Sequence, residues 1–153
     1  MVYDVELREV QSQPIASIRA TTTPEKIGTT LTGDLSKIYG LLAQQGIRPT
    51  GPPVAVYYEF GPGRVAFESG VPVTGSFQSD GEIKPSALPS GRAAFTRHIG
   101  PYEGLGGAHD AVREWIEANG YVHAGPDWEI YPMPPGGEPD PAKLVTEVYW
   151  RVQ

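Results

Sequence analysis

One carboxylate in this sequence lies among aromatic residues at a spacing that could bind a cation. Residues 127–133 (DWEIYPM) predict a strand, and neighbouring side chains on a strand alternate between its two faces. Glu129 and Tyr131 therefore share one face, while Trp128 lies on the other. A carboxylate flanked by tyrosines can hold a large organic cation through charge and through attraction to the ring faces, worth about 0.5–2 kcal/mol per ring. By spacing alone, a solvated glutamate on an open sheet face is an equally good interpretation.

An internal repeat singles out the same glutamate. Residues 46–58 align with residues 120–132 at a constant offset, and apolar helix positions upstream keep that offset. The matched pairs are Leu31 with Leu105, Ile38 with Val112, Leu41 with Trp115, Leu42 with Ile116, Gly46 with Gly120, Gly51 with Gly125, Pro52 with Pro126 and Tyr57 with Tyr131. Ala55 stands in the first copy where Glu129 stands in the second. Repeats indicate a duplicated architecture, so a carboxylate present in one copy only is a natural place for function.

Aromatic and acidic residues on the neighbouring strands extend this candidate site. Tyr57 shares a strand face with Ala55, as Tyr131 does with Glu129. Glu147, with Glu68 at the equivalent place in the first copy, could add negative potential; a solvent-facing, salt-bridged carboxylate is the favoured interpretation of both. The candidate ligand-binding residues are Glu129, Tyr131, Tyr57, Ala55, Tyr149, Tyr102 and Glu147.

Several other chemistries lack the residues they need. The absence of cysteine excludes disulfides and thiolate metal sites. His98, His109 and His123 are scattered, without the spacing or acidic companions of zinc ligands, so we expect neither a metal nor a cofactor. His98, at a strand end before Gly100, is expected to organise the turn by hydrogen bonding. A net charge of −6 without a Lys/Arg cluster argues against a nucleic-acid partner.

The elements that would position these residues occur in the same order in each half. Alternating segments predict strands and 3.6-residue periodicity predicts helices. The expected strands are 2–10, 14–20, 54–60, 64–73, 82–88, 92–99, 127–133 and 143–152, and the expected helices run from Thr23-Pro24 to Gln45 and within 101–119. This order predicts an α+β fold with about eight mostly antiparallel strands and two long helices. The loop 132–141, rich in proline and glycine, is expected to rim the site.

Length and composition indicate one globular domain. The 153 residues suit a single domain, 1–153, built of pseudo-repeats 1–77 and 78–153. The start of the chain lacks the basic flank and apolar core of a signal peptide, and no apolar run approaches the roughly 18 residues that cross a bilayer. We therefore expect a cytoplasmic location and no membrane partner.

Motifs concentrated in the second half resemble those of a known family. The motifs are Arg97-His98-Ile99-Gly100-Pro101-Tyr102, a helix with Trp115-Ile116 before Gly120, the strand Trp128-Glu129-Ile130-Tyr131, and Thr146-Glu147-Val148-Tyr149. In order and spacing they resemble the GyrI-like small-molecule-binding family, in the superfamily of bacterial transcription activator effector-binding domains. The resemblance implies tandem strand–helix–strand–strand modules related by a pseudo-twofold axis. It also implies binding of hydrophobic, often cationic or aromatic, drug-like molecules in a cleft between the modules, anchored by a glutamate that matches Glu129. Many relatives begin with a DNA-binding helix-turn-helix, whereas this chain starts at the binding domain, so direct DNA contact is not expected.

Three functions are compatible with this sequence. The favoured one is a stand-alone multidrug or effector-binding module. The second is a hydrolase of strained electrophilic natural products, with Glu129 as general acid or base and Tyr131 or Tyr57 polarising the leaving oxygen. The third, suggested by the resemblance alone, is a gyrase-inhibitor-like interaction protein. The same carboxylate serves the first two, so the sequence does not separate a binding protein from an enzyme.

Overall fold

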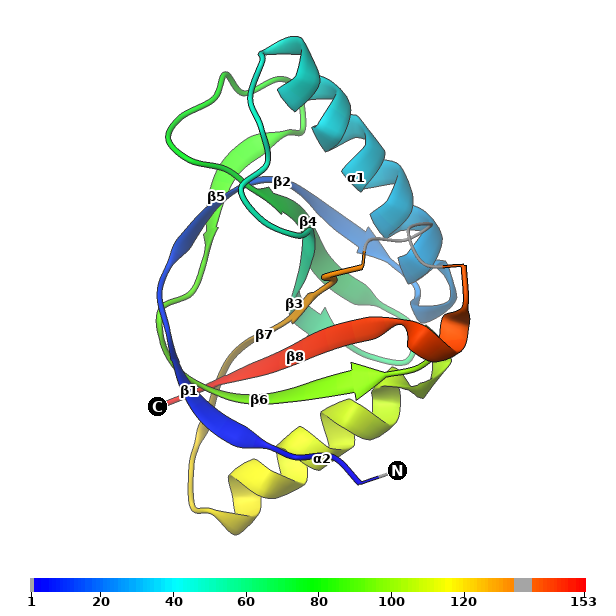
Figure 1. Cartoon of the computed structure of the whole chain (residues 1–153), viewed down its shortest axis with the longest axis vertical. Helices are drawn as coiled ribbons and strands as arrows, with labels where there is room; N and C mark the ends of the chain where they lie inside the picture. Colours follow the sequence, from blue (N-terminus) through cyan, green and yellow to red (C-terminus); the bar gives the residue numbers. More distant parts are fainter. Residues whose placement is uncertain (1, 134–138) are drawn as a thin grey trace. The chain divides into compact units, whose positions relative to one another are not determined.

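The computed structural model describes residues 2–133 and 139–153. Its strands are β1 (Glu6–Val10), β2 (Gln13–Thr22), β3 (Val54–Phe60), β4 (Val65–Pro72), β5 (Lys84–Leu88), β6 (Gly91–Ile99), β7 (His123–Ile130) and β8 (Val145–Val152), and its long helices are α1 (Ile27–Gln44) and α2 (Leu105–Ala118) (Figure 1). Within this described part, the strands of each compact unit pair antiparallel. The expected α+β fold with eight strands and two long helices is confirmed. The centre of the expected loop 132–141 lies outside the described residues.

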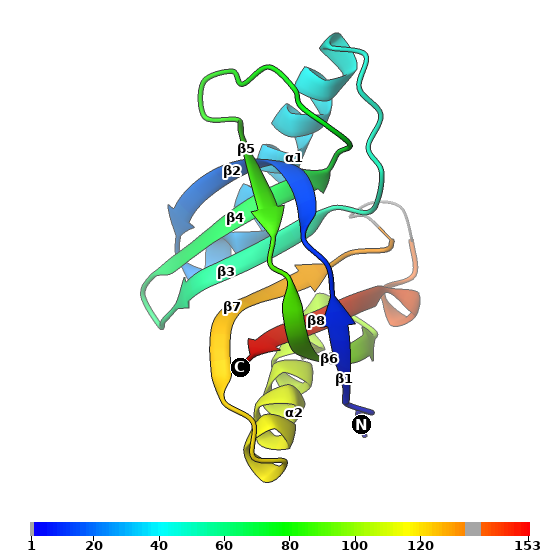
Figure 2. The ribbon, with the colours of Figure 1, turned by 90° about the vertical axis from the view of Figure 1, so that its left-hand side faces the viewer.

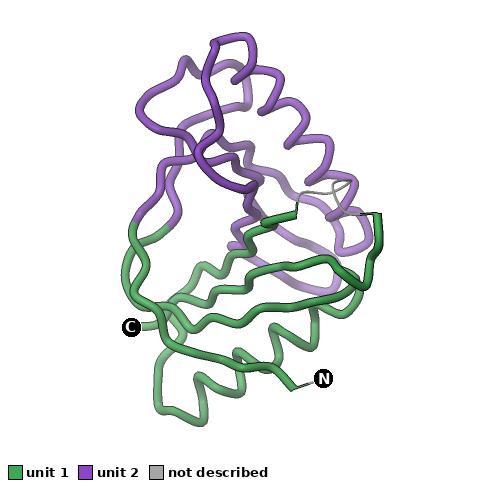
Figure 3. The backbone as a smooth tube through the Cα atoms, viewed as in Figure 1, with its two compact units in different colours: residues 1–11, 89–153 green, residues 12–88 purple. Residues whose placement is uncertain are grey.

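Two compact units make up the chain (Figure 3). Unit 2 is residues 12–88, with α1 and strands in the order β3-β4-β2-β5; unit 1 is residues 1–11 and 89–153, with α2 and strands in the order β1-β6-β8-β7. This division differs from the expected repeats, because β1 pairs with β6 and β5 pairs with β2 (Figure 2). Sheet hydrogen bonds, not continuity along the chain, therefore decide which unit each edge strand joins.

Strand register confirms that the two units are built alike. In unit 2, Val56 of β3 pairs with Glu68 of β4; in unit 1, Ile130 of β7 pairs with Glu147 of β8. Since Val56 and Ile130 are matched by the repeat, Glu68 and Glu147 occupy equivalent positions, as expected. Counting along the two strands from Glu68 and Glu147 in the same direction matches the other residues of β4 with those of β8.

Each helix covers its sheet with the apolar face that the sequence predicts. The buried residues of α1 include Leu31, Leu35, Ile38, Leu41 and Leu42. In unit 1 the core between helix and sheet contains Ala94, Ala108, Val112, Ile116, Val148 and Val152. Burial of such side chains stabilises the fold by about 25 cal/mol per Å² of apolar surface removed from water.

Both helices end in the same glycine motif. Gly46 and Gly120 follow α1 and α2 with φ of +68° and +73°. In each case the glycine N–H donates to the carbonyl three residues earlier, and the next N–H donates to the carbonyl five residues earlier. These bonds satisfy carbonyls that the helix end leaves unpaired, and the left-handed backbone explains why both copies have glycine there.

Replacing the terminal glycine should destabilise the protein. We expect Gly120→Ala to lower the free energy of unfolding by about 1 kcal/mol, because alanine is strained at positive φ. Gly40→Ala is the matched control: Gly40 lies inside α1, where an added Cβ meets no atom within 4 Å, so alanine should stabilise by about 0.5–1 kcal/mol. Urea denaturation measures both; a stabilising Gly120→Ala would contradict the strained-backbone argument.

One acidic side chain lies on the buried face of α1. Asp34 is 8% exposed, and its Oδ2 is buried without a hydrogen-bond partner among the described residues. Burial raises the pKa of Asp34 above its ordinary value of 3.8, against a smaller opposing effect of Lys37. The folded protein therefore holds this proton more tightly than the unfolded chain does. The resulting stabilisation is complete below the unfolded pKa and is lost as the pH rises through the raised folded pKa.

Removing this carboxylate should stabilise the protein near neutral pH. We expect Asp34→Ala to raise the free energy of unfolding at pH 7 by about 1–2 kcal/mol, the cost of an unsatisfied buried polar group. The equivalent position of α2 already holds Ala108. The gain should shrink towards pH 4, where Asp34 takes up its proton. Denaturation from pH 4 to 7 tests this against Asp110→Ala, which removes an exposed carboxylate from α2; a pH-independent difference would show that ionisation of Asp34 is not the cause.

Candidate functional site

Glu129 points into the core between the sheet of unit 1 and α2. It lies on β7 directly opposite Val148 of β8, and Val148 packs in the core cluster with α2. Paired residues on neighbouring strands share a sheet face, so the carboxylate lies on the helix-covered face. Its residue is only 5% exposed. Glu129 is therefore a buried residue, and a solvated glutamate on an open sheet face is excluded.

Two side chains donate hydrogen bonds to this carboxylate. The Tyr131 hydroxyl donates to Oε1 at 2.6 Å. His109, which projects from α2, places Nε2 2.7 Å from Oε2. On the other side of the imidazole, the Trp150 indole donates from Nε1 to His109 Nδ1 at 2.9 Å. Side chains from α2, β7 and β8 are thus linked in one chain of hydrogen bonds.

The indole determines which nitrogen of His109 carries the proton. The indole N–H can only donate, so His109 Nδ1 must be an unprotonated acceptor. The neutral imidazole then has its proton on Nε2, which donates to Glu129. A doubly protonated imidazole would place two N–H groups against each other at Trp150. In this arrangement the tyrosine hydroxyl and the imidazole both donate as uncharged groups.

The equivalent positions in unit 2 are apolar. Leu35 matches His109, Ala55 matches Glu129, and Val71 of β4 matches Trp150 of β8 by the register above. All three are buried, at 4%, 0% and 0% exposed. Unit 2 therefore forms the same helix-on-sheet core without these polar groups. The helix-on-sheet architecture therefore does not itself require the polar network of unit 1.

Tyr102 contributes an unused hydroxyl beside the network. It lies in the 3-10 turn Tyr102–Gly104 before α2, with its ring edge-on to that of Tyr131 at 6.2 Å. Its hydroxyl is buried and has no hydrogen-bond partner in the part of the chain that the structure describes. Burial, and then the charge of Glu129, raise the pKa of Tyr102. The phenol therefore stays protonated and can donate to a bound molecule.

The histidines differ from the sequence expectation in one respect. We expected none of them to have an acidic companion, but His109 pairs with Glu129 and His123 Nε2 lies 2.5 Å from Asp127 Oδ1. The first pair is separated by 20 residues and forms only in the fold. His98 behaves as expected: it bonds Pro101 O and the Tyr3 hydroxyl, both at 2.8 Å, and so holds the turn.

The remaining candidate residues do not join this network. Tyr149 and Glu147 lie on β8 next to Val148, and alternation puts them on the sheet face away from α2. Tyr149 stacks on Trp128 there, with centroids 5.1 Å apart and planes 4° apart. Glu147 forms the expected salt bridge, 3.6 Å from Arg97.

Ala55 and Tyr57 belong to unit 2. Ala55 is fully buried, and Tyr57 stacks on Phe67 at 5.8 Å. Residue spacing does not point to His109 or Trp150. The repeat carries one signal for His109, which stands where the matched helix has a buried leucine.

No group of three or more His, Cys, Asp or Glu side chains among the described residues could hold a metal ion. None of the helices in residues 2–133 and 139–153 is long and apolar enough to cross a membrane.

Comparison with known proteins places the chain in a family. Residues 3–153 match the model of the GyrI-like small molecule binding domain. A search of curated protein sequences found no match. Among solved structures, the C-terminal domain of EcmrR has a TM-score of 0.89 at 23% identity, with 100% of this chain and 99% of that chain covered. In the cryo-EM structure of the EcmrR–DNA complex the TM-score is 0.87 at 22% identity, and the match covers 99% of this chain but 57% of that chain.

Two more distant structures share the fold. A hydrolase encoded by lin2189 from Listeria innocua has a TM-score of 0.69 at 12% identity, with 97% of this chain and 91% of that chain covered. The structure of SAV2435 bound to tetraphenylphosphonium has a TM-score of 0.64 at 18% identity, with 100% and 94% covered. At these identities the likeness establishes the fold alone.

The hydrogen-bond chain predicts the tautomer of one histidine. In ¹⁵N NMR spectra near neutral pH we expect His109 to show a protonated Nε2 and an unprotonated Nδ1, because the Trp150 indole occupies Nδ1. Trp150→Phe removes that donor and should shift the His109 ring nitrogens while leaving those of His98 unchanged. A protonated Nδ1 in the unaltered protein would contradict the network.

Proposed function

We propose that this chain, which belongs to the GyrI-like small molecule binding domain family, binds a hydrophobic organic cation in unit 1 with Glu129 as its anchor. The observation that carries the proposal is the state of that carboxylate. It is buried, and the Tyr131 hydroxyl and the His109 imidazole hold it by hydrogen bonds. A cation that reaches Glu129 adds a charge–charge attraction, which is stronger in a site with little water than at the surface.

Aromatic rings around the carboxylate suit the rest of such a ligand. Tyr131 and Tyr102 meet edge to face, and Trp150 packs against both His109 and His123. Ring faces attract a cation, and the rings bury apolar surface of the ligand. The Tyr102 hydroxyl adds a donor for a polar group. SAV2435, which has the same fold, has been solved with tetraphenylphosphonium, a cation that carries four phenyl rings.

Access to Glu129 requires local movement, since the residue is 5% exposed. The first turn of α2 is the least stable part of the helix by propensity, because Gly106 and Gly107 follow Leu105 and each glycine disfavours a helix by about 1 kcal/mol. His109 is one turn further on. Opening of this first turn would admit a ligand beside Tyr102 without disturbing the sheet.

A hydrolase is the second candidate, supported by the His109–Glu129 pair and by the shared fold with the Listeria innocua hydrolase. A general base needs a free lone pair within reach of the proton it removes. His109 has none in this arrangement: Nδ1 accepts from Trp150, and Nε2 carries the proton that it donates to Glu129. His109 is therefore not the base in this arrangement, and an enzyme of this kind would use Glu129 in that role.

The proposed role also includes regulation through ligand binding. EcmrR has been solved in complex with DNA, and its C-terminal domain aligns with the whole of this chain. We therefore propose that the chain acts as an effector-binding domain, which changes its interaction with a partner when the ligand is bound. DNA contact by this domain itself forms no part of the proposal.

Neutralising the anchor should weaken cation binding selectively. We expect Glu129→Gln to lower the affinity for tetraphenylphosphonium about 10- to 100-fold, the usual effect of losing an interaction with a charged group. Affinity for neutral triphenylphosphine oxide should change little. Quenching of tryptophan fluorescence measures both. Glu147→Gln is the matched control, since it neutralises a carboxylate on the opposite sheet face; equal tetraphenylphosphonium affinity in the Glu129 variant and the unaltered protein would rule out the anchor.

The enzymatic alternative is tested by turnover. Incubation with ring-strained electrophiles, such as aryl epoxides, should yield no more product than the uncatalysed reaction. Product in molar excess over the protein, lost in Glu129→Gln and retained in Glu147→Gln, would instead establish the hydrolase.

A further inference from the structure

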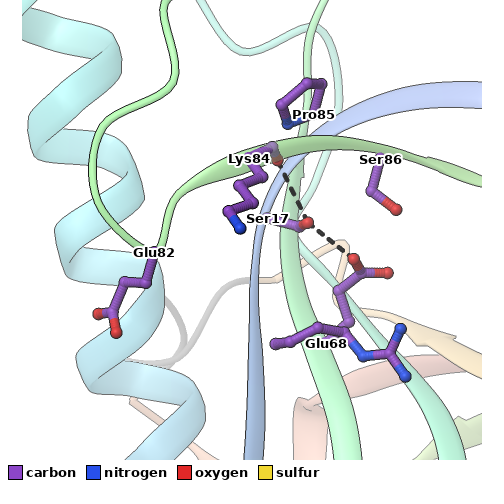
Figure 4. A pocket seen from close by; sticks show the side chains of 7 residues that line it. Ser17, Glu68, Glu82, Lys84, Pro85 and Ser86 are labelled. Carbon is purple, nitrogen blue, oxygen red and sulfur yellow. Dashed lines mark hydrogen bonds between the residues drawn. The ribbon is translucent and has the colours of Figure 1, made fainter.

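Unit 2 contains a cavity that is lined by none of the residues of the Glu129 network. Its volume is about 440 Å³, within the range of small-molecule sites. The residues that line it come from β2, β4 and β5 and the turn before β5: Ser17, Arg19, Glu68, Glu82, Lys84, Pro85 and Ser86 (Figure 4). Glu68 is on the strand face opposite to that of its neighbours Phe67 and Ser69. The repeat matches Ser69 with Val148, which packs on α2, so Glu68 lies on the face that α1 does not cover.

The floor of the cavity is a buried carboxylate. Glu68 is 4% exposed, so the expectation of a solvent-facing, salt-bridged carboxylate is wrong for this residue; Ser17 is 3% exposed. The Ser17 hydroxyl donates to Glu68 Oε2 at 2.7 Å and also lies 3.3 Å from the Lys84 carbonyl (Figure 4). The Tyr58 hydroxyl donates to Oε1 at 2.9 Å. Burial, together with the charge of Glu68, raises the pKa of Tyr58 to about 12, so this donor stays protonated.

Two cations at the rim have no acidic partner. The Arg19 guanidinium lies over the Tyr58 ring, with its carbon 3.8 Å from the centroid, and Lys84 projects from β5. Neither forms an ion pair with any described residue. Glu82, the other acid of the cavity lining, is paired with Lys37 at 2.9 Å. The cavity therefore has a negative floor and an uncompensated positive rim.

The equivalent place in unit 1 shows why this arrangement is unusual. Arg19 lies opposite Glu68 in the sheet, as Arg97 lies opposite Glu147. In unit 1 the two side chains form an ion pair at 3.6 Å. In unit 2 the arginine stacks on Tyr58 instead, and its N–H donors form no ion pair with a carboxylate in the described part of the chain.

We propose that this cavity binds a small zwitterion, with its ammonium group towards Glu68 and its carboxylate towards Arg19 and Lys84. A simple anion would be repelled by the buried carboxylate, and a simple cation by the two rim charges. Only a molecule with one positive and one negative group can pair with the buried carboxylate and with the rim cations at the same time. Such charge complementarity is a source of specificity. Arg19 offers the planar pair of donors that a carboxylate accepts.

Three probes of equal chain length test the charge requirement. They are 6-aminohexanoate, hexylamine and hexanoate, titrated into the ¹⁵N-labelled full chain. We expect 6-aminohexanoate to shift the amide signals of Ser17, Lys84 and Ser86 in a saturable way. The two singly charged probes should bind at least about tenfold more weakly. Equal binding of hexanoate or hexylamine, or shifts that avoid β2 and β5, would overturn the proposal.

Matched variants locate the binding. Arg19→Gln and Glu68→Gln should each lower the affinity for 6-aminohexanoate at least about tenfold, while Arg97→Gln and Glu147→Gln, the equivalent changes in unit 1, should leave it unchanged. Arg19 is exposed, so its variant keeps the test decisive if Glu68→Gln fails to fold. Unaltered affinity in Arg19→Gln would reject the site. Tetraphenylphosphonium binding should persist in Arg19→Gln, so this proposal and the one for Glu129 succeed or fail separately.

Discussion

A carboxylate buried between a sheet and a helix must be held by donors, and in this chain Tyr131 and His109 hold Glu129. The charge at the site depends on a third residue, Trp150, because its indole N–H fixes the neutral tautomer of the imidazole. If the histidine were protonated, Glu129 would belong to an internal ion pair and would attract a cation less. The hydrogen-bond chain thus offsets the cost of burying the carboxylate.

Duplication allows the polar network to be compared with its own apolar counterpart. Unit 2 packs Leu35, Ala55 and Val71 at the positions that hold His109, Glu129 and Trp150 in unit 1. The glycine motif after each helix is the same in both units, and the pairing of Val54–Val56 with β4 matches that of Trp128–Ile130 with β8. The features that both units share therefore build the fold. The polar network lies at positions where the two copies differ.

Unit 2 has a polar difference of its own on the other face of its sheet. Tyr58 binds both members of what is an ion pair in unit 1: its hydroxyl donates to Glu68 and its ring accepts Arg19. Each unit thus has one buried carboxylate held by a tyrosine hydroxyl and a second donor. In unit 1 it lies on the helix-covered face, and in unit 2 on the face away from the helix.

Sequence alone determined the class of fold, the helix faces, the glycine stops and the position of Glu129 on a strand with Tyr131. These follow from periodicity and from backbone conformation, which are local properties of the chain. Only the tertiary structure decided that β1 and β5 join the units they do, that Glu129 is buried, and that Tyr149 and Glu147 lie on the other face from it. It also brought His109 and Trp150 together, 41 residues apart in the chain. Contacts of that kind depend on which strand pairs with which and on how the helix rotates over the sheet, and neither is encoded in the spacing of neighbouring residues.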